Sequence, residues 1–131
     1  MKTQLLIEKA IEAKEKAYAP YSNFKVGAAL ITEDNKLYTG CNIENSSYGA
    51  TNCAERTAIF KAVSEGHCKI KMMAVVGNEK DYAYPCGICR QVIGEFAAKD
   101  FQIIIIKNRE EYIIKTLDDI MPLAFNSESL K

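Results

Sequence analysis

The sequence predicts an α/β fold in which helices cover a mixed five-stranded sheet. Three observations support this: an early segment with helical apolar spacing, five short apolar runs typical of strands, and helix-like segments that alternate with the later runs. The order helix, hairpin, helix, strand, helix, strand is typical of a sheet with helices packed on its faces. No repeat or linker interrupts the 131 residues, so we expect one domain, residues 1–131.

The composition is that of an ordinary globular protein, with 48% apolar and 26% charged residues. Seventeen basic residues balance seventeen acidic ones, so neither a nucleic acid nor a membrane surface is an expected partner. The apolar run at 103–106 is too short to span a bilayer. The first segment carries Glu8, Glu12 and Glu15 and is no signal peptide, which predicts a cytoplasmic protein.

The first half of the chain should form a helix and a hairpin. Apolar residues spaced by three and four predict a helix over 5–18, which Pro20 ends. Two apolar runs, 26–31 and 37–43, flank the polar turn 33–36. They are expected to pair as a β-hairpin.

The second half should alternate helices with strands. Helices are predicted from 53 to about 65 and from 87 to 98, each after a loop that leaves a strand. Their N-termini should therefore lie side by side at the carboxyl ends of those strands, where such sheets place ligands. The run 101–106 is branched on both faces, which indicates a buried central strand. The remaining expected elements are strands at 71–76 and 112–115 and a helical turn at 116–120.

Three of the five cysteines suggest a metal site. Cys53 opens one predicted helix, whereas Cys86 and Cys89 open the other and share a face because they are three residues apart. Helix N-termini lower thiol pKa values, and Gly87 is expected to allow a tight turn around the metal. Three thiolates leave the fourth tetrahedral position open, as a catalytic zinc requires.

Glu55 makes the pattern more specific. It lies two residues after Cys53, where a carboxylate can take a proton from zinc-activated water and pass it on. The segments Cys53-Ala54-Glu55 and Pro85-Cys86-Gly87-Ile88-Cys89 together match the zinc deaminase signature. Two alternatives remain open: Glu55 completes a helix capping box with Asn52, or the last two cysteines form a redox pair.

With these motifs the chain resembles the small homotetrameric cytidine deaminases over nearly its whole length. The matching segments are 21–30, 40–45, 52–56, 85–92 and 121–125. The resemblance implies a three-layer α/β/α cytidine-deaminase-like fold with one Zn²⁺ per chain. It also implies hydrolysis of cytidine and deoxycytidine to uridine, deoxyuridine and ammonia, as in pyrimidine salvage.

The resemblance also implies roles for individual residues. The implied roles are zinc ligation by Cys53, Cys86 and Cys89, proton transfer by Glu55, packing on the pyrimidine by Phe24, ribose binding by Asn42 and Glu44, and completion of a neighbouring subunit's pocket by Phe125. Arg56 follows Glu55 directly and could donate hydrogen bonds that offset the thiolate charge. Ile88 and Tyr84 depart from the family pattern, which leaves the pocket shape open.

Simpler interpretations exist for several of these residues. Phe24 could be a core aromatic, and Asn42 and Glu44 could merely end a strand, although strand alternation gives them the same face. Arg56 and Arg90 could be solvated surface charges. The others are Cys41 and Cys68, expected to be buried or inert thiols, and His67, expected to favour a helix C-terminus rather than bind metal.

Three other functions compete with cytidine deamination. A deaminase of the same fold could act on another amino-pyrimidine nucleoside, such as a nucleoside antibiotic. A polynucleotide deaminase is disfavoured because the chain is neutral. A non-enzymatic zinc module would be expected to close its site with a fourth ligand, and no further Cys or His has suitable spacing.

Overall fold

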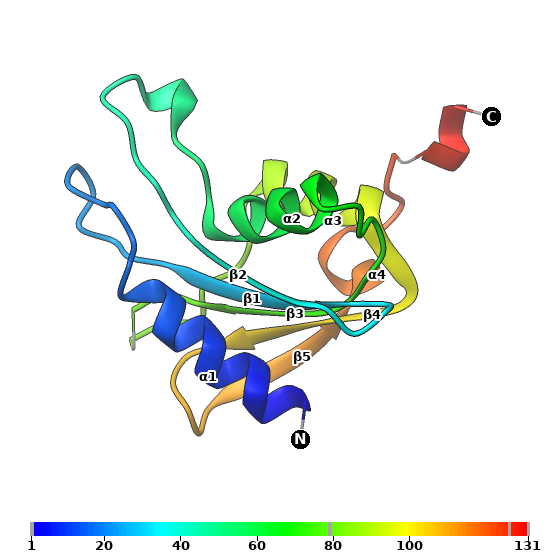
Figure 1. The fold of residues 1–131 in the computed structure, drawn as a ribbon, viewed down its shortest axis with the longest axis horizontal. Helices are drawn as coiled ribbons and strands as arrows, with labels where there is room; N and C mark the ends of the chain where they lie inside the picture. Colours follow the sequence, from blue (N-terminus) through cyan, green and yellow to red (C-terminus); the bar gives the residue numbers. More distant parts are fainter. Residues whose placement is uncertain (1, 79, 126, 131) are drawn as a thin grey trace.

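A computed structural model describes residues 2–78, 80–125 and 127–130, and its helices lie on both faces of one sheet (Figure 1). Helix α1 covers one face, and α2 and α3 cover the other, which confirms the expected three-layer α/β/α arrangement. The elements are α1 Lys2–Lys14, β1 Gly27–Thr32, β2 Leu37–Cys41, η1 Tyr48–Ala50, α2 Ala54–Ser64, β3 Ile70–Val76, α3 Gly87–Phe96, β4 Ala97–Ile106, β5 Tyr112–Thr116, α4 Leu117–Ile120 and η2 Ser127–Leu130.

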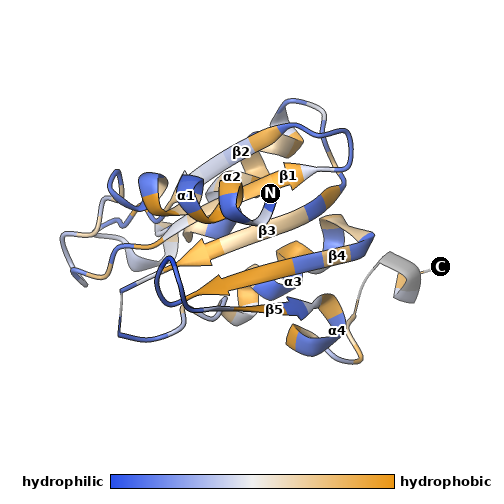
Figure 2. Ribbon diagram, turned by 90° about the horizontal axis from the view of Figure 1, so that it is seen from below, coloured by the Kyte–Doolittle hydropathy of each residue, from blue (hydrophilic) through white to orange (hydrophobic). Residues whose placement is uncertain are grey.

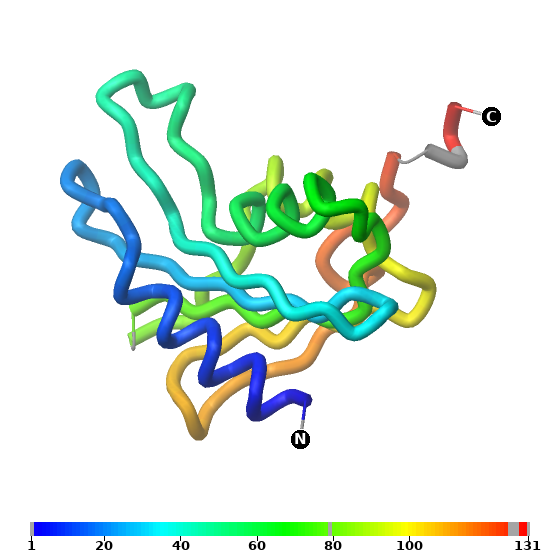
Figure 3. Tube along the Cα trace, in the orientation of Figure 1, coloured from blue at the N-terminus to red at the C-terminus, as the bar shows by residue number. Residues whose placement is uncertain are grey.

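The five strands have the order β2-β1-β3-β4-β5. β1 and β2 form the predicted antiparallel hairpin, with Leu30 opposite Tyr38. β1 is also antiparallel to β3, so β2 and β3 run in the same direction, and β3 is parallel to β4. The carboxyl ends of β2 and β3 therefore meet at one edge of the sheet, from which the chain leads to α2 and α3 (Figure 3).

Strand alternation divides the core into two layers. In β1, Ala28 and Leu30 pack beneath α2 and α3, whereas Ala29 and Ile31 pack against α1. β4 repeats this pattern, and residues 103–106 are fully buried, as the branched run predicted. Seen from the α1 side, β1, β3 and β4 are hydrophobic along much of their length (Figure 2). A sheet covered on both faces requires such strands.

Two glycines let helices approach the sheet closely. A Cβ at Gly40 in β2 would lie 2.5 Å from the Ala58 nitrogen and 2.6 Å from the Ala54 oxygen, both in α2. A Cβ at Gly27 in β1 would lie 2.1 Å from the Ala10 oxygen of α1. Both helices thus contact the sheet backbone to backbone. No described atom lies within 4 Å of a Cβ built at Gly87, so contacts with the rest of the described chain do not require glycine there.

Several element boundaries differ from the predictions. The first helix ends at Lys14, because Tyr18 pairs instead with the chain after β2: its nitrogen donates to the Asn42 oxygen at 3.0 Å, and its oxygen accepts from the Glu44 nitrogen at 2.8 Å. β2 ends at Cys41, and β4 begins at Ala97, where a helical residue was expected. Among the described residues, none of the helices combines the length and the apolar character that membrane crossing requires.

Candidate active site

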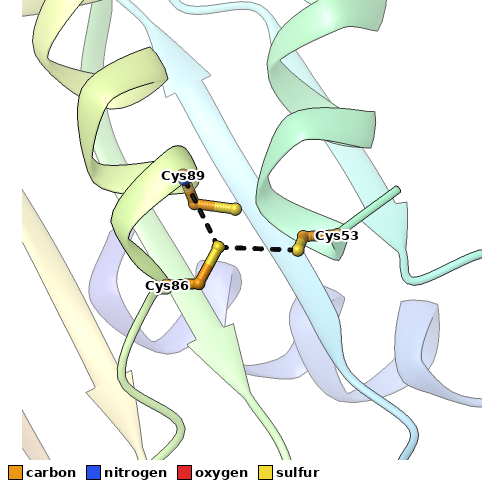
Figure 4. A group of neighbouring side chains, drawn as sticks. All are labelled: Cys53, Cys86 and Cys89. Carbon is orange, nitrogen blue, oxygen red and sulfur yellow. Dashed lines mark hydrogen bonds between the residues drawn. The ribbon is translucent and has the colours of Figure 1, made fainter. Parts of the chain in front are cut away.

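The site is built where α2 and α3 begin. Cys53 and Cys86 are the N-cap residues of these helices, both with extended backbones, and Cys89 lies one turn into α3. Their sulfur atoms point toward one another (Figure 4). All three lie within 4.8 Å of one another, and the Sγ atoms of Cys53 and Cys86 are 3.8 Å apart. The two predicted helix starts thus meet as the sequence indicated.

The cluster fits one zinc ion. Sulfurs bound at about 2.3 Å to a tetrahedral zinc lie about 3.8 Å apart, which is the spacing of Cys53 and Cys86. Within the described ranges, the cluster contains these three cysteines and no fourth protein ligand. Such a set leaves one coordination position open, which distinguishes catalytic from structural zinc sites.

The charges of the thiols support this fit. The hydrogen bond with Cys89, together with the Arg56 guanidinium, lowers the pKa of Cys53 to about 5. The same bond with Cys53, and burial, raise the pKa of the Cys89 thiol. Neighbouring thiols cannot all ionise beside one another without a compensating cation. A divalent metal ion supplies that compensation.

Glu55 is a buried carboxyl group, with 4% of its surface exposed. Burial raises its pKa to about 7, which suits a group that both accepts and returns protons near neutrality. The alternative capping box does not form: Cys53 is the N-cap and makes no side-chain capping bond. The Asn52 amide instead donates to the Thr57 hydroxyl at 3.0 Å.

A cavity of about 470 Å³ connects these groups with the other predicted site residues. Phe24 lines it with 41% of its surface exposed, so Phe24 is not a core residue. Its ring lies across the end of β3, where a Cβ at Gly77 would come within 2.9 Å of the ring. The lining includes Ser22, Phe24, Asn42, Glu44, Thr51, Cys53, Glu55, Tyr82, Tyr84 and Cys86.

Asn42 and Glu44 line the same cavity although β2 ends before them. The Asn42 amide holds the segment beside it, accepting from the Val26 nitrogen and donating to the Phe24 oxygen, both at 2.8 Å. Glu44 accepts from the Tyr21 and Ser22 nitrogens and from the Ser22 hydroxyl. The bond from the Ser22 hydroxyl is the main reason why the pKa of Glu44 is lowered.

Neither Arg56 nor Arg90 is a solvated surface charge. The Arg56 Nη2 donates to the Cys53 Sγ at 3.3 Å, and these contacts with Cys53 raise the arginine pKa. Its buried Nε has no partner among the described residues. Arg90 donates to the Pro85 oxygen at 2.8 Å and to the Ile120 oxygen at 2.9 Å, so it fixes the segment that enters α3.

The remaining candidates lie outside the cluster. The His67 Nδ1 is 2.8 Å from an Asp34 carboxylate oxygen, beyond the C-terminus of α2. Cys41 is half-buried and Cys68 is exposed, so neither is the fully buried thiol that was one expectation. Phe125 is 61% exposed, and its oxygen accepts from the Gln91 amide at 2.9 Å. Sequence reasoning missed the cavity residues Ser22, Thr51 and Tyr82, which belong to no metal or proton-transfer motif.

Together, the layered sheet, the paired helix starts and the buried carboxyl group beside three cysteines define a class of zinc-binding α/β proteins equipped for metal-assisted hydrolysis. The family model of the cytidine and deoxycytidylate deaminase zinc-binding region matches residues 1–105. The chain belongs to this family.

Similar proteins align with nearly the full length of this chain. A cytidine deaminase of Sporosarcina psychrophila is 47% identical over 99% of this chain and 96% of its own. The crystal structure of a cytidine deaminase from Burkholderia pseudomallei superposes with a TM-score of 0.89 at 46% identity, covering 95% of this chain and all of that one. A cytidine deaminase structure from Mycobacterium tuberculosis gives 0.83 at 36% identity, covering 95% and 98%.

Proposed function

We propose that the chain is a zinc-dependent cytidine deaminase that hydrolyses free cytidine and deoxycytidine. The observation that carries the proposal is the buried Glu55 carboxyl group, which lines the same cavity as two of the three clustered cysteines. Membership of the deaminase family and the names of its full-length relatives support the choice of substrate. Cys53, Cys86 and Cys89 are the proposed zinc ligands.

The reaction replaces the 4-amino group of cytosine with oxygen from water. A zinc ion held by the cysteines supplies Lewis acidity that makes water nucleophilic at neutral pH. Glu55 accepts a proton from the attacking water and delivers it to N3 of the pyrimidine. It then relays the second water proton to the departing amino group, so cytidine and water become uridine and ammonia. Arg56 donates a hydrogen bond to the Cys53 sulfur and so offsets part of the thiolate charge.

The cavity favours a nucleoside over a nucleotide. No lysine or arginine lines it in the part of the chain that the structure describes, whereas Glu44 and Glu55 both do. A 5′-phosphate or a polynucleotide backbone would therefore meet acidic side chains without a lysine or arginine to compensate its charge, which is unfavourable for anions. Within the family named for both cytidine and deoxycytidylate, this lining supports cytidine as the substrate.

Asn42 and Glu44 are the proposed ribose contacts, and Phe24 is the proposed packing surface for the pyrimidine. An amide can make four hydrogen bonds and a carboxylate about four. Asn42 uses two of these for the backbone, and Glu44 uses three for Tyr21 and Ser22. Both residues thus retain capacity for one or two sugar hydroxyls without releasing the loop.

A side-by-side assay tests the function. Cytidine, deoxycytidine, cytosine, cytidine 5′-monophosphate and a short cytosine-containing strand are each mixed with the purified protein, and the absorbance change is followed. The two nucleosides should react, and the other three should react slowly or not at all, because unfilled polar groups of a sugar site discriminate strongly. Comparable rates on cytosine or on the strand would contradict the free-nucleoside assignment.

We further propose that the chain forms a single domain and a homotetramer in which Phe125 completes a neighbouring pocket. Exposed apolar side chains on α3, before it and near the C-terminus support an assembly: Tyr84, Ile88, Leu123 and Phe125. An active species that sediments near 14.6 kDa would exclude the tetramer. With this activity, the enzyme would act in pyrimidine salvage, and a cytoplasmic location suits its free thiols.

A further inference from the structure

We propose that Ser22 is a positioning residue whose hydroxyl couples the sugar-binding and base-packing sides of the cavity. The inference rests on the proposed function, since it concerns how Glu44 and Phe24 are held for a nucleoside. All three residues line the 470 Å³ cavity. Ser22 lies outside the proposed metal and proton-transfer groups.

The hydroxyl of Ser22 bonds to both sides at once. It donates its proton to the Oε2 of Glu44, and its oxygen accepts from the Phe24 nitrogen at 3.0 Å. A serine hydroxyl has one proton and two lone pairs. The proton is used for the Glu44 carboxylate, and one lone pair accepts from the Phe24 backbone N–H. One oxygen atom therefore links the proposed sugar contact directly to the backbone of the proposed base contact.

The hydroxyl also determines how Glu44 is oriented. Oε1 accepts from the Tyr21 and Ser22 nitrogens, at 2.9 and 3.2 Å, whereas Oε2 receives its bond from the Ser22 hydroxyl. Ser22 and Glu44 also line a second hollow of about 250 Å³, next to Tyr48. Without the hydroxyl, Oε2 would lose this tie, and the carboxylate could rotate toward the second hollow instead of the substrate cavity.

Phe24 is held from two directions. Asn23 has a φ of 59°, a left-handed conformation that asparagine tolerates, and this turn brings the Phe24 nitrogen back to the Ser22 hydroxyl. On the other side, the Phe24 oxygen accepts from the Asn42 amide at 2.8 Å. The loop thus joins Phe24 to both proposed ribose contacts, through Ser22 to Glu44 and directly to Asn42.

These contacts predict an effect on substrate binding more than on turnover. Ser22→Ala should raise KM for cytidine about tenfold, the size expected for one hydrogen bond to a charged group. The turnover number should stay within about twofold, because Glu55 and the cysteines keep their contacts. Ser22→Thr restores the hydroxyl and should bring KM back to within about threefold of wild type. Zinc content should be unchanged in both variants.

A matched control and a double variant separate positioning from a general structural effect. Ser64→Ala removes a hydroxyl that donates to the Lys61 oxygen in its own helix and lies outside the cavity lining, so it should leave KM unchanged. In a Glu44→Gln background, Ser22→Ala should add less than in wild type, because the charged acceptor is already gone. A merely structural role would instead give additive losses, with reduced zinc content and thermal stability.

The outcomes also separate this inference from the proposed function. A wild-type protein that does not convert cytidine would overturn both. An active wild type with an unchanged KM for Ser22→Ala would overturn the coupling alone, as would strict additivity with Glu44→Gln. If Ser22→Ala fails to fold, a tenfold KM defect that persists in the folded Ser22→Thr variant would contradict the hydroxyl's role.

Discussion

Helices α2 and α3 begin with the same residue type at the N-cap, but the side chains of the two N-cap residues make different hydrogen bonds. Both have a cysteine as N-cap with an extended backbone. The Cys86 sulfur accepts from the Cys89 nitrogen at 3.4 Å, whereas the Cys53 side chain makes no capping bond and instead accepts from Arg56. In contrast, α4 has an oxygen cap, in which Thr116 and Asp119 bond to each other reciprocally.

This difference shows that the cysteine N-caps provide metal ligands but cap their helices more weakly than oxygen side chains do. Sulfur is a weak acceptor, so a cysteine N-cap stabilises a helix less than serine or aspartate would. The helix dipole compensates in part, because both positive N-termini face the sulfur cluster and favour its negative charge. Cys53 and Cys86 are therefore suited to metal binding at the expense of local helix stability.

The largest expected effect comes from removing the ligand that also caps a helix. Cys86→Ala should lose zinc and, with it, the deaminase activity, because two thiols form an inadequate site. Cys68→Ala is the matched control, since that thiol is exposed and outside the cluster. Metal analysis of both purified variants measures the effect, and full zinc retention in Cys86→Ala would contradict the proposed ligand set.

The next largest effect is expected at Glu55, near the start of α2, where catalysis can be separated from metal binding. Glu55→Gln should keep zinc and fold, yet lose activity by at least about 10²–10⁴-fold, the usual contribution of one acid–base group. Initial rates with cytidine, together with zinc content, measure both. Near-normal turnover would show that the buried carboxyl group does not transfer the protons.

A smaller effect tests Arg56, which donates a hydrogen bond to the Cys53 sulfur. Arg56→Ala should weaken zinc binding by about 10- to 100-fold, the usual range for groups that hydrogen-bond to metal ligands. Arg109→Ala is the control, because that arginine is exposed and pairs with Glu8 on the other side of the sheet. Competition with a chelator measures zinc affinity, and equal values for the two variants would exclude a role for Arg56.

The smallest effect concerns the oxygen cap. Thr116→Ala should destabilise the fold by about 1 kcal/mol without changing zinc content. The backbone nitrogen and hydroxyl of Thr116 lower the pKa of Asp119. The Asp119 carboxylate therefore stabilises the fold at pH values above its pKa in the unfolded chain. This stabilisation is lost as the pH falls through the lowered pKa that Asp119 has in the folded chain. Denaturant unfolding of both proteins at several pH values measures this, and equal stabilities would contradict it.

Much of the fold and the metal cluster could be predicted because the relevant signals are local. Short apolar runs located the strands and helical spacing located the helices, whereas three-residue spacing united Cys86 with Cys89. Ser22 and Arg90 were not recognised as linking residues, because their partners, Glu44 and Ile120, are 22 and 30 positions away. The capping interpretation of Glu55 was wrong because tertiary burial, rather than the helix start, determines its environment.

Gly40 has a consequence for how this sequence can change over time. Even a methyl group there would strike the backbone of α2 at Ala54 and Ala58, and a backbone cannot move aside as a flexible side chain does. The displaced helix would carry Cys53 away from the two cysteines of α3. At Gly49, in contrast, no atom of the described residues lies within 4 Å of a built Cβ. Active descendants should therefore vary freely at position 49 while retaining glycine at position 40, although Gly40 belongs to none of the proposed catalytic or binding groups.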